Sequence, residues 1–123
     1  MRLAEAAGSM MKDLFLDSPH PHVVVTPYPR RSLKTKASER IIPLVGTSLW
    51  AAQRLSESAY RDFCFPRYTD EQRCNSNSAS AAINKWLKSI LGDEAVTHWL
   101  RHSLRDRLRP AEALTELVDQ LGG

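Results

Sequence analysis

The segment at residues 97–109 constrains the fold more than any other, because it carries a helical pattern on two sides at once. On one side, apolar residues recur every four positions: Val96, Leu100, Leu104 and Leu108. This spacing gathers them into one stripe along a helix of ordinary pitch, and we expect the stripe to face a core. Thr97 is the expected N-cap. The pattern therefore predicts an amphipathic helix.

The other side of the same helix is basic. Its residues recur at intervals of three or four, which also suits one side of a helix: His98, His102, Arg105 and Arg109. Arg101 lies on the border between the two sides, where its stem can be buried while its guanidinium faces outward. With His98 and Arg101 in the first turn, free backbone N–H groups and the helix dipole favour a phosphate there. A phosphate site is one interpretation, and a merely solvated basic face is the other.

A metal site is a third use of this helix, and a weaker one. His98 and His102 are four apart, so two imidazoles share one face. However, no glutamate sits beside the first histidine and no obvious third ligand follows. We expect neither a metal nor a cofactor.

Composition and charge describe a single globular domain. The chain has 123 residues and a formal net charge of +3, enough for one core. Basic residues gather at 30–40 and 101–109, whereas acidic residues lie at 112–119, so one face should be positive. Cys64 and Cys74 lack zinc-site spacing and are expected to be free thiols in a reducing cytoplasm. No apolar run is long enough to span a bilayer, and we expect no signal sequence.

Shorter patterns predict the remaining elements, and together they indicate a mainly helical α+β fold. β-branched runs predict strands at residues 22–26, 31–35 and 39–44, which would form a small three-stranded antiparallel sheet. Further helices are expected at residues 2–7, 47–59, 79–91 and 111–121. Ser78 should cap the third of these and Gly92 should end it. Its inward residues are expected to be Ala82, Ile83, Trp86, Leu87 and Ile90.

Two features outside these helices keep two interpretations each. The loop at residues 63–68 is aromatic and basic, so its rings could stack on a nucleic-acid base or plug an edge of the core. Lys34 and Lys36 lie near the turn of the predicted hairpin. They could contact a ligand or only protect an exposed strand edge against aggregation.

Three segments, in this order, resemble the catalytic domain of the tyrosine recombinases, the phage integrase family. Residues 1–5 (Met-Arg-Leu-Ala-Glu) are similar to the family's first arginine box, and residues 31–44 to its lysine-bearing hairpin. Residues 97–102 (Thr-His-Trp-Leu-Arg-His) are similar to its His-x-x-Arg box. The resemblance covers nearly the whole chain and implies the integrase catalytic fold, a helical core with a small three-stranded antiparallel sheet.

The resemblance also implies catalytic roles. Arg2 and Arg101 would neutralise the scissile phosphate of DNA as a pentacoordinate state forms, which two guanidinium groups can do without a metal. His98 would exchange a proton with the nucleophile. Lys34 matches the family's position for protonating the departing 5′ oxygen, and Lys36 is the alternative.

Other residues would support this chemistry. Glu5 is expected to orient Arg2, and His102 is expected to be orienting or structural rather than catalytic. Contacts to the DNA would come from a further set of basic residues: Arg31, Lys36, Arg67, Arg105 and Arg109.

The chain departs from the family pattern at the nucleophile. The family's tyrosine follows the His-x-x-Arg box, whereas Tyr28, Tyr60 and Tyr68 all precede it. The final Leu-Gly-Gly looks like the turn before that tyrosine. We therefore expect residues 1–123 to be a partial catalytic domain, inactive alone, that lacks the nucleophile segment and the N-terminal DNA-gripping domain.

The resemblance predicts the parent protein's activity and partners. The parent would be an enzyme of site-specific DNA recombination and integration, acting through a 3′-phosphotyrosyl intermediate on double-stranded DNA. It would assemble with other recombinase protomers in a synaptic complex, away from membranes, in the cytoplasm of a bacterium that carries a phage or prophage. The alternative is a non-catalytic DNA-binding remnant of a prophage integrase that uses the same basic face.

Overall fold

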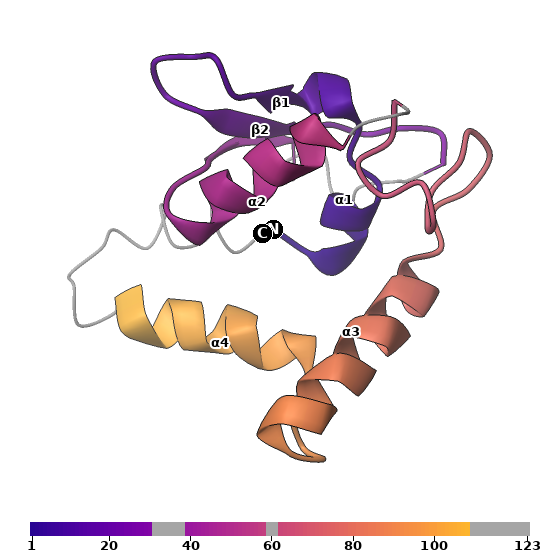
Figure 1. The fold of residues 1–123 in the computed structure, drawn as a ribbon, viewed down its shortest axis with the longest axis vertical. Coiled ribbons are helices and arrows are strands. Elements are labelled where there is room, and N and C mark those ends of the chain that lie inside the picture. The colour runs from indigo at the N-terminus through magenta and orange to yellow at the C-terminus, as the bar shows by residue number, and fades with distance from the viewer. Residues whose placement is uncertain (31–38, 59–61, 109–123) are drawn as a thin grey trace.

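The described part of the chain combines four α-helices with one small sheet (Figure 1). The computed structural model describes residues 1–30, 39–58 and 62–108, without the side chains of residues 105 and 108. The mainly helical α+β fold predicted from the sequence is confirmed, while the predicted helix at 111–121 lies outside the described residues. In chain order the elements are α1 (Leu3–Ala7), a 3-10 turn η1 (Met11–Asp13), β1 (Leu14–Phe15), β2 (His22–Val25), β3 (Arg40–Pro43), α2 (Thr47–Glu57), α3 (Ser76–Leu91) and α4 (Thr97–Leu108).

The sheet is antiparallel and has the order β1-β2-β3. In its centre, Val23 lies opposite Leu14 of β1 and Ile42 of β3. Two of the three predicted strands are confirmed with shorter bounds, but the described third strand is β1. With only two residues, β1 is too short to show an alternating pattern in the sequence. The predicted strand at 31–35 lies outside the described residues.

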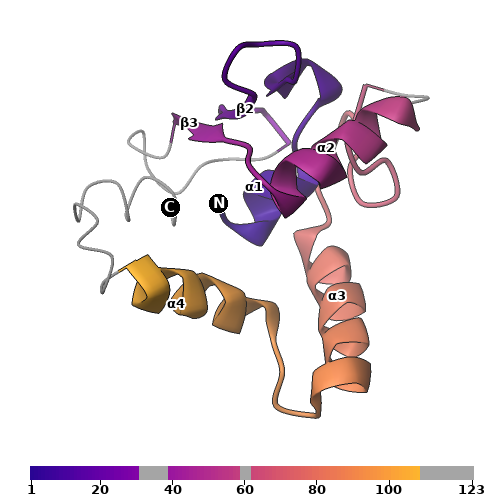
Figure 2. The same ribbon diagram turned by 60° about the vertical axis from the view of Figure 1, so that its left-hand side comes forward.

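The core lies between this sheet and α2, which lies in front of the sheet in Figure 1 and beside it in Figure 2. Along β2, the buried Val23 and Val25 alternate with less buried neighbours, as the two-residue period of a strand requires. Leu49 and Ala52 of α2 pack against them. The central cluster consists of Val23, Val25, Ile42, Leu44 and Ala52.

Helix ends follow local chemistry, with one prediction wrong. Gly8 follows α1, and Gly92 ends α3 with a φ of +102° that favours glycine, both as predicted. The cap of α3 is Asn75, whose side-chain oxygen accepts the backbone N–H of Ser78 at 3.1 Å. Ser78 was the predicted cap, but an asparagine three residues earlier fills that role, so the helix begins three residues earlier than expected, at Ser76. No helix among residues 1–30, 39–58 and 62–108 is long and apolar enough to cross a membrane.

The helix α3 leads away from the sheet and α4 returns across the molecule toward the chain's beginning (Figure 2). The predicted inward side of α3 is largely wrong. Leu87 is buried, but Ala82 is exposed, Ile83 is only half-buried, and Trp86 and Ile90 are about 60% exposed, at 61% and 59%. The helix contacts α1 and α4 rather than a broad layer, so one stripe of its residues is covered and the rest is not.

The apolar stripe of α4 also lacks the expected cover. Leu100 is 61% exposed and Leu104 is 42% exposed, while Val96 is half-buried and the Leu108 side chain lies outside the described residues. The helix itself is confirmed, beginning at Thr97 and continuing to Leu108. Periodicity fixes which residues share a side of a helix, but not whether another element packs on that side.

Candidate active site

Arg2 stands directly before α1, and a residue of the same helix fixes its backbone. Its φ of −83° and ψ of 154° are extended, so it is not yet helical. The Glu5 carboxylate accepts the backbone N–H of Arg2 at 2.7 Å, a bond that satisfies a donor the helix leaves open. The contact between Glu5 and Arg2 is thus to the Arg2 backbone, and orientation of the Arg2 side chain by Glu5 stays a prediction.

Arg101 lies near the start of α4, and the first turn of this helix is anchored by a hydrogen bond to α3. Thr97 is the first helical residue rather than the predicted cap. Its backbone N–H donates to the side-chain oxygen of Asn84 on α3 at 2.8 Å. The N–H of Trp99 donates to the carbonyl of Val96 at 3.0 Å. Because these N–H groups are bonded within the protein, attraction for an anion here comes mainly from side chains.

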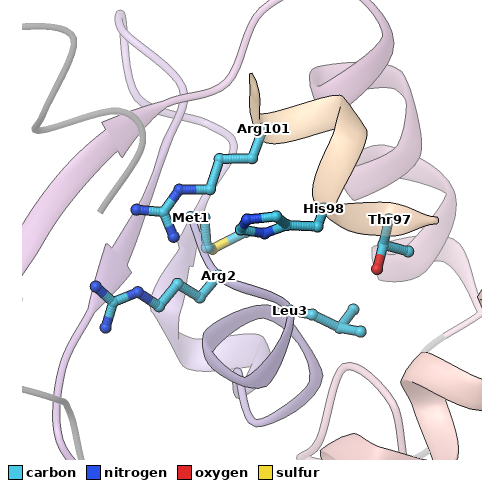
Figure 3. Close-up of a pocket in the computed structure, with 6 residues that line it drawn as sticks. All are labelled: Met1, Arg2, Leu3, Thr97, His98 and Arg101. Carbon is cyan, nitrogen blue, oxygen red and sulfur yellow. The ribbon is translucent and has the colours of Figure 1, made fainter. Parts of the chain in front are cut away.

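These two elements meet at one cavity of about 280 Å³. Figure 3 shows that the side chains of Arg2 and Arg101 extend in the same direction and that the His98 imidazole points into the same space. The structure thus brings together Arg2, His98 and Arg101, which come from near opposite ends of the described chain. The cavity is lined by Met1, Arg2, Leu3, Thr97, His98 and Arg101.

An apolar groove of about 360 Å³ adjoins this cavity and shares both arginines with it. Its wall includes Ile83 of α3 and Leu100 and Leu104 of α4. The exposed leucines of α4 therefore face a groove beside the cavity instead of a closed core. Arg101 is half-buried between the cavity and the groove, which agrees with its predicted place on the border between the apolar and basic sides.

The two histidines of α4 contact each other. The ring centroids of His98 and His102 are 4.4 Å apart and the rings are nearly perpendicular, at 86°. An edge-to-face contact of this kind restrains both rings, and it suits an orienting role for His102. No group of three or more His, Cys, Asp or Glu side chains that could hold a metal occurs within residues 1–30, 39–58 and 62–108.

Arg40 is the functional candidate that the sequence did not reveal. It lies at the start of β3, and its Nη2 is 2.9 Å from Oε2 of Glu5, with Nη1 at 3.4 Å from Oε1. Both side chains are buried, at 8% and 5% exposure. Its membership in the basic stretch 30–40 was the only signal, because no local pattern pairs residues 35 apart.

Charge and hydrogen bonding set the protonation of Glu5. Burial by itself would raise the pKa of its carboxyl group, but the hydrogen bonds from Arg40 and from the Arg2 backbone, together with the positive charge of Arg40, lower it below the ordinary value of 4.5. Glu5 is therefore ionised at neutral pH. A fixed carboxylate lies just behind Arg2.

Positive charge converges at the cavity. The pKa of the Met1 amino group lies below its ordinary value, first because the group is buried and then because Arg40, Arg101 and Arg2 place positive charge nearby. Glu5 acts in the opposite direction. Several cations thus act on one point of the cavity wall, and such an arrangement favours an anionic ligand.

The remaining candidates are placed less centrally or lie outside the described residues. Arg67 is exposed and lies over the ring of Tyr68 at 5.8 Å. In the same loop Phe63 is half-buried beneath the guanidinium of Arg30 at 4.8 Å, so this aromatic ring packs within the protein. Outside the described residues lie Arg31, Lys34, Lys36 and Arg109, together with the side chain of Arg105.

Comparison with known proteins identifies the chain's family. The model of the phage integrase family matches residues 1–123. The chain belongs to the phage integrase family. The resemblance found in the sequence is therefore confirmed, and this family consists of tyrosine recombinases, enzymes of site-specific DNA recombination. Neither the curated proteins nor the solved structures contain a match to this integrase chain.

Proposed function

We propose that this integrase chain forms the scissile-phosphate pocket of a site-specific DNA recombinase. The observation that supports the proposal is the shared cavity of Arg2, His98 and Arg101. It combines two guanidinium groups with one imidazole, which are the groups that tyrosine-based phosphodiester exchange requires. The substrate is double-stranded DNA, and the activity of the whole enzyme is recombination by DNA breaking and rejoining.

Arg2 and Arg101 act as the phosphate clamp in this proposal. During attack, the phosphorus becomes pentacoordinate and negative charge builds on its nonbridging oxygens. Two guanidinium forks that point the same way (Figure 3) can each donate two parallel hydrogen bonds to those oxygens. Their charge is permanent, so they stabilise the transition state without protonation changes or a metal.

His98 and a hairpin lysine handle the protons. The tyrosine oxygen forms a bond to phosphorus while the bond from phosphorus to the 5′ oxygen breaks, leaving a 3′-phosphotyrosyl link. His98, held against His102, accepts the proton of the tyrosine hydroxyl during cleavage and returns it during rejoining. Lys34 donates a proton to the departing 5′ oxygen, and Lys36 is the alternative donor.

The nucleophile comes from outside these 123 residues in this proposal. Tyr28 donates its hydroxyl to the Asp13 carboxylate, and Tyr68 lies in the loop beneath Arg67. Neither is among the residues that line the cavity, and Tyr60 lies outside the described residues. The parent protein would also contribute a DNA-gripping domain and would assemble with further protomers at the recombination site, in the bacterial cytoplasm.

The test uses the full-length protein that contains this sequence and a nicked suicide DNA substrate, which traps the covalent intermediate. We expect a protein–DNA adduct that Arg101→Ala reduces by at least about 100-fold, the typical cost of removing a donor that stabilises the transition state. Arg54→Ala is the matched control, because Arg54 is exposed and pairs only across one turn of α2 with Glu57. The control should leave adduct formation unchanged.

Two outcomes would contradict the proposal. An adduct unaffected by Arg101→Ala would show that the pocket is elsewhere. Salt-dependent DNA binding without any adduct would instead support the non-catalytic remnant, in which basic residues contact only the DNA backbone.

A further inference from the structure

We infer that Arg40 is a positioning residue of the phosphate clamp: acting through Glu5, it fixes the backbone of Arg2 beside the cavity. The inference rests on the proposed function, because it concerns the placement of a residue that we propose contacts the phosphate. Arg40 itself is not among the residues that line the cavity. In this inference, its effect on Arg2 passes through Glu5.

One oxygen atom connects the three residues. Oε2 of Glu5 accepts the backbone N–H of Arg2 at 2.7 Å and contacts Nη2 of Arg40 at 2.9 Å. The second guanidinium nitrogen of Arg40 reaches the other carboxylate oxygen at 3.4 Å. The planar fork of an arginine fixes both the position and the rotation of a carboxylate, which a single-point contact cannot do. The orientation that suits the Arg2 N–H is thereby selected.

The helix α1 needs such an anchor. It has five residues, whereas isolated helices shorter than about 12–15 residues are marginal in water. Arg2 precedes even its first residue and has an extended backbone. The position of Arg2 is thus set by contacts from elsewhere in the fold.

β3 provides a rigid origin for that contact. Arg40 lies opposite Val25 in the sheet, and Val25 is 1% exposed within the main core cluster. Both members of the Arg40–Glu5 pair are themselves almost fully buried. The pair therefore connects the backbone of Arg2 to the buried core of the sheet. In this inference the sheet determines the position of one half of the clamp.

The test is a double-mutant cycle in the full-length recombinase, read as the single-turnover rate of suicide-substrate cleavage at saturating DNA. We expect Arg40→Met to slow cleavage by about 10–100-fold, the range found when a supporting contact of a functional group is lost. In an Arg2→Lys background the same change should cost less than about 3-fold, because a flexible ammonium does not depend on a fixed fork geometry. Arg2→Lys keeps a cation, which keeps the rate measurable.

The matched control is Arg54→Met, which removes an exposed ion pair with 59% and 57% exposed side chains on α2. It should leave the cleavage rate unchanged in both backgrounds. If Arg40→Met does not fold, Arg40→Lys replaces it, since this variant keeps the charge and loses only the fork. It should slow cleavage about 10-fold in the Arg2 background, the smaller end of the expected range, and by less than about 3-fold in Arg2→Lys.

An equal loss in both backgrounds, or a loss of DNA affinity with an unchanged cleavage rate, would overturn the inference and show a general structural role. Full-speed cleavage by Arg40→Met while Arg2→Lys is slow would also overturn it, yet leave the proposed function standing. Full-speed cleavage by both Arg2→Lys and Arg101→Ala would overturn the proposed function, and the inference with it.

Discussion

The buried pair of Arg40 and Glu5 makes a stability prediction that can be worked out from its geometry. Arg40→Met keeps the length of the side chain but removes the guanidinium that lies 2.9 Å from the carboxylate. The Glu5 side chain is 5% exposed, so water cannot replace the lost partner. Removing one member of a buried ion pair costs about 3–5 kcal/mol, and we expect a loss in the free energy of unfolding of that size at pH 7.

The pH dependence identifies Glu5 as the source of this loss. In the unchanged protein the pKa of Glu5 lies below 4.5, so its stabilising contribution is present above that pH and is lost as the pH falls through the folded-state pKa. Without Arg40, the carboxylate loses a hydrogen bond and a positive charge that lower its pKa while burial still raises it, so the folded-state pKa should rise. The folded variant then takes up a proton at a higher pH than the unchanged folded protein does. The stability difference should be largest at neutral pH and shrink on acidification.

Urea unfolding of the full-length protein at pH 7 and pH 4 measures both effects. The variant Glu5→Gln/Arg40→Met should recover most of the loss at pH 7, because it leaves no unpaired buried charge and the amide oxygen can still accept the Arg2 N–H. Arg54→Met should change stability by less than about 1 kcal/mol, as an exposed pair would. A loss that is equal at both pH values, or that the double variant does not recover, would refute this account.

Three further substitutions test how the site and core are built. Asn84→Ala removes the oxygen that accepts the Thr97 N–H at 2.8 Å. We expect the free energy of unfolding, measured by thermal unfolding, to fall by about 1 kcal/mol, as for a helix cap, and cleavage by the whole enzyme to be slower. Unchanged stability would contradict the anchoring role. Val25 is 1% exposed, and Val25→Ala should lower the free energy of unfolding in urea by roughly 2–3 kcal/mol. Leu104 is 42% exposed, so Leu104→Ala should lower it by less than about 1.5 kcal/mol although it removes more atoms. The reverse order would show that Leu104 is covered in solution.

Local patterns in the sequence predicted the elements that local chemistry determines. The β-branched run at 22–26 became β2, and the four-residue periodicity after Val96 became α4. Gly92 ended α3 because a φ of +102° is costly for any residue with a Cβ atom. In each case the information lies within a few residues of the feature. Composition and spacing therefore sufficed for the fold class.

Predictions of burial failed where the packing partner lies elsewhere in the chain. The prediction of the helix cap failed where two similar residues could both serve. The stripe through Leu100 and Leu104 was recognised, but the space beside it is a groove rather than a core. Asn75 and Ser78 are both good caps, and the sequence does not say which will begin the helix. The N–H of Thr97 is satisfied by Asn84 from another helix, which no reading of the local sequence could show.

The same limit explains why the arginines of the proposed clamp were found while two of the residues that support them, Arg40 and Asn84, were not. Arg2 and Arg101 stand in short recognisable motifs, but the contacts that locate them cross between elements: Arg40 from β3 through Glu5 for one, and Asn84 from α3 at the start of α4 for the other. The position of each guanidinium therefore depends on a different part of the fold. Because an error of about 1 Å in a reacting group can cost a factor of about 100 in rate, substitutions at Arg40 or Asn84 should slow the chemistry while leaving the charge of the cavity lining unchanged. In the proposed function, the geometry of the phosphate pocket depends on the sheet and on α3 as much as on the motifs that contain Arg2 and Arg101.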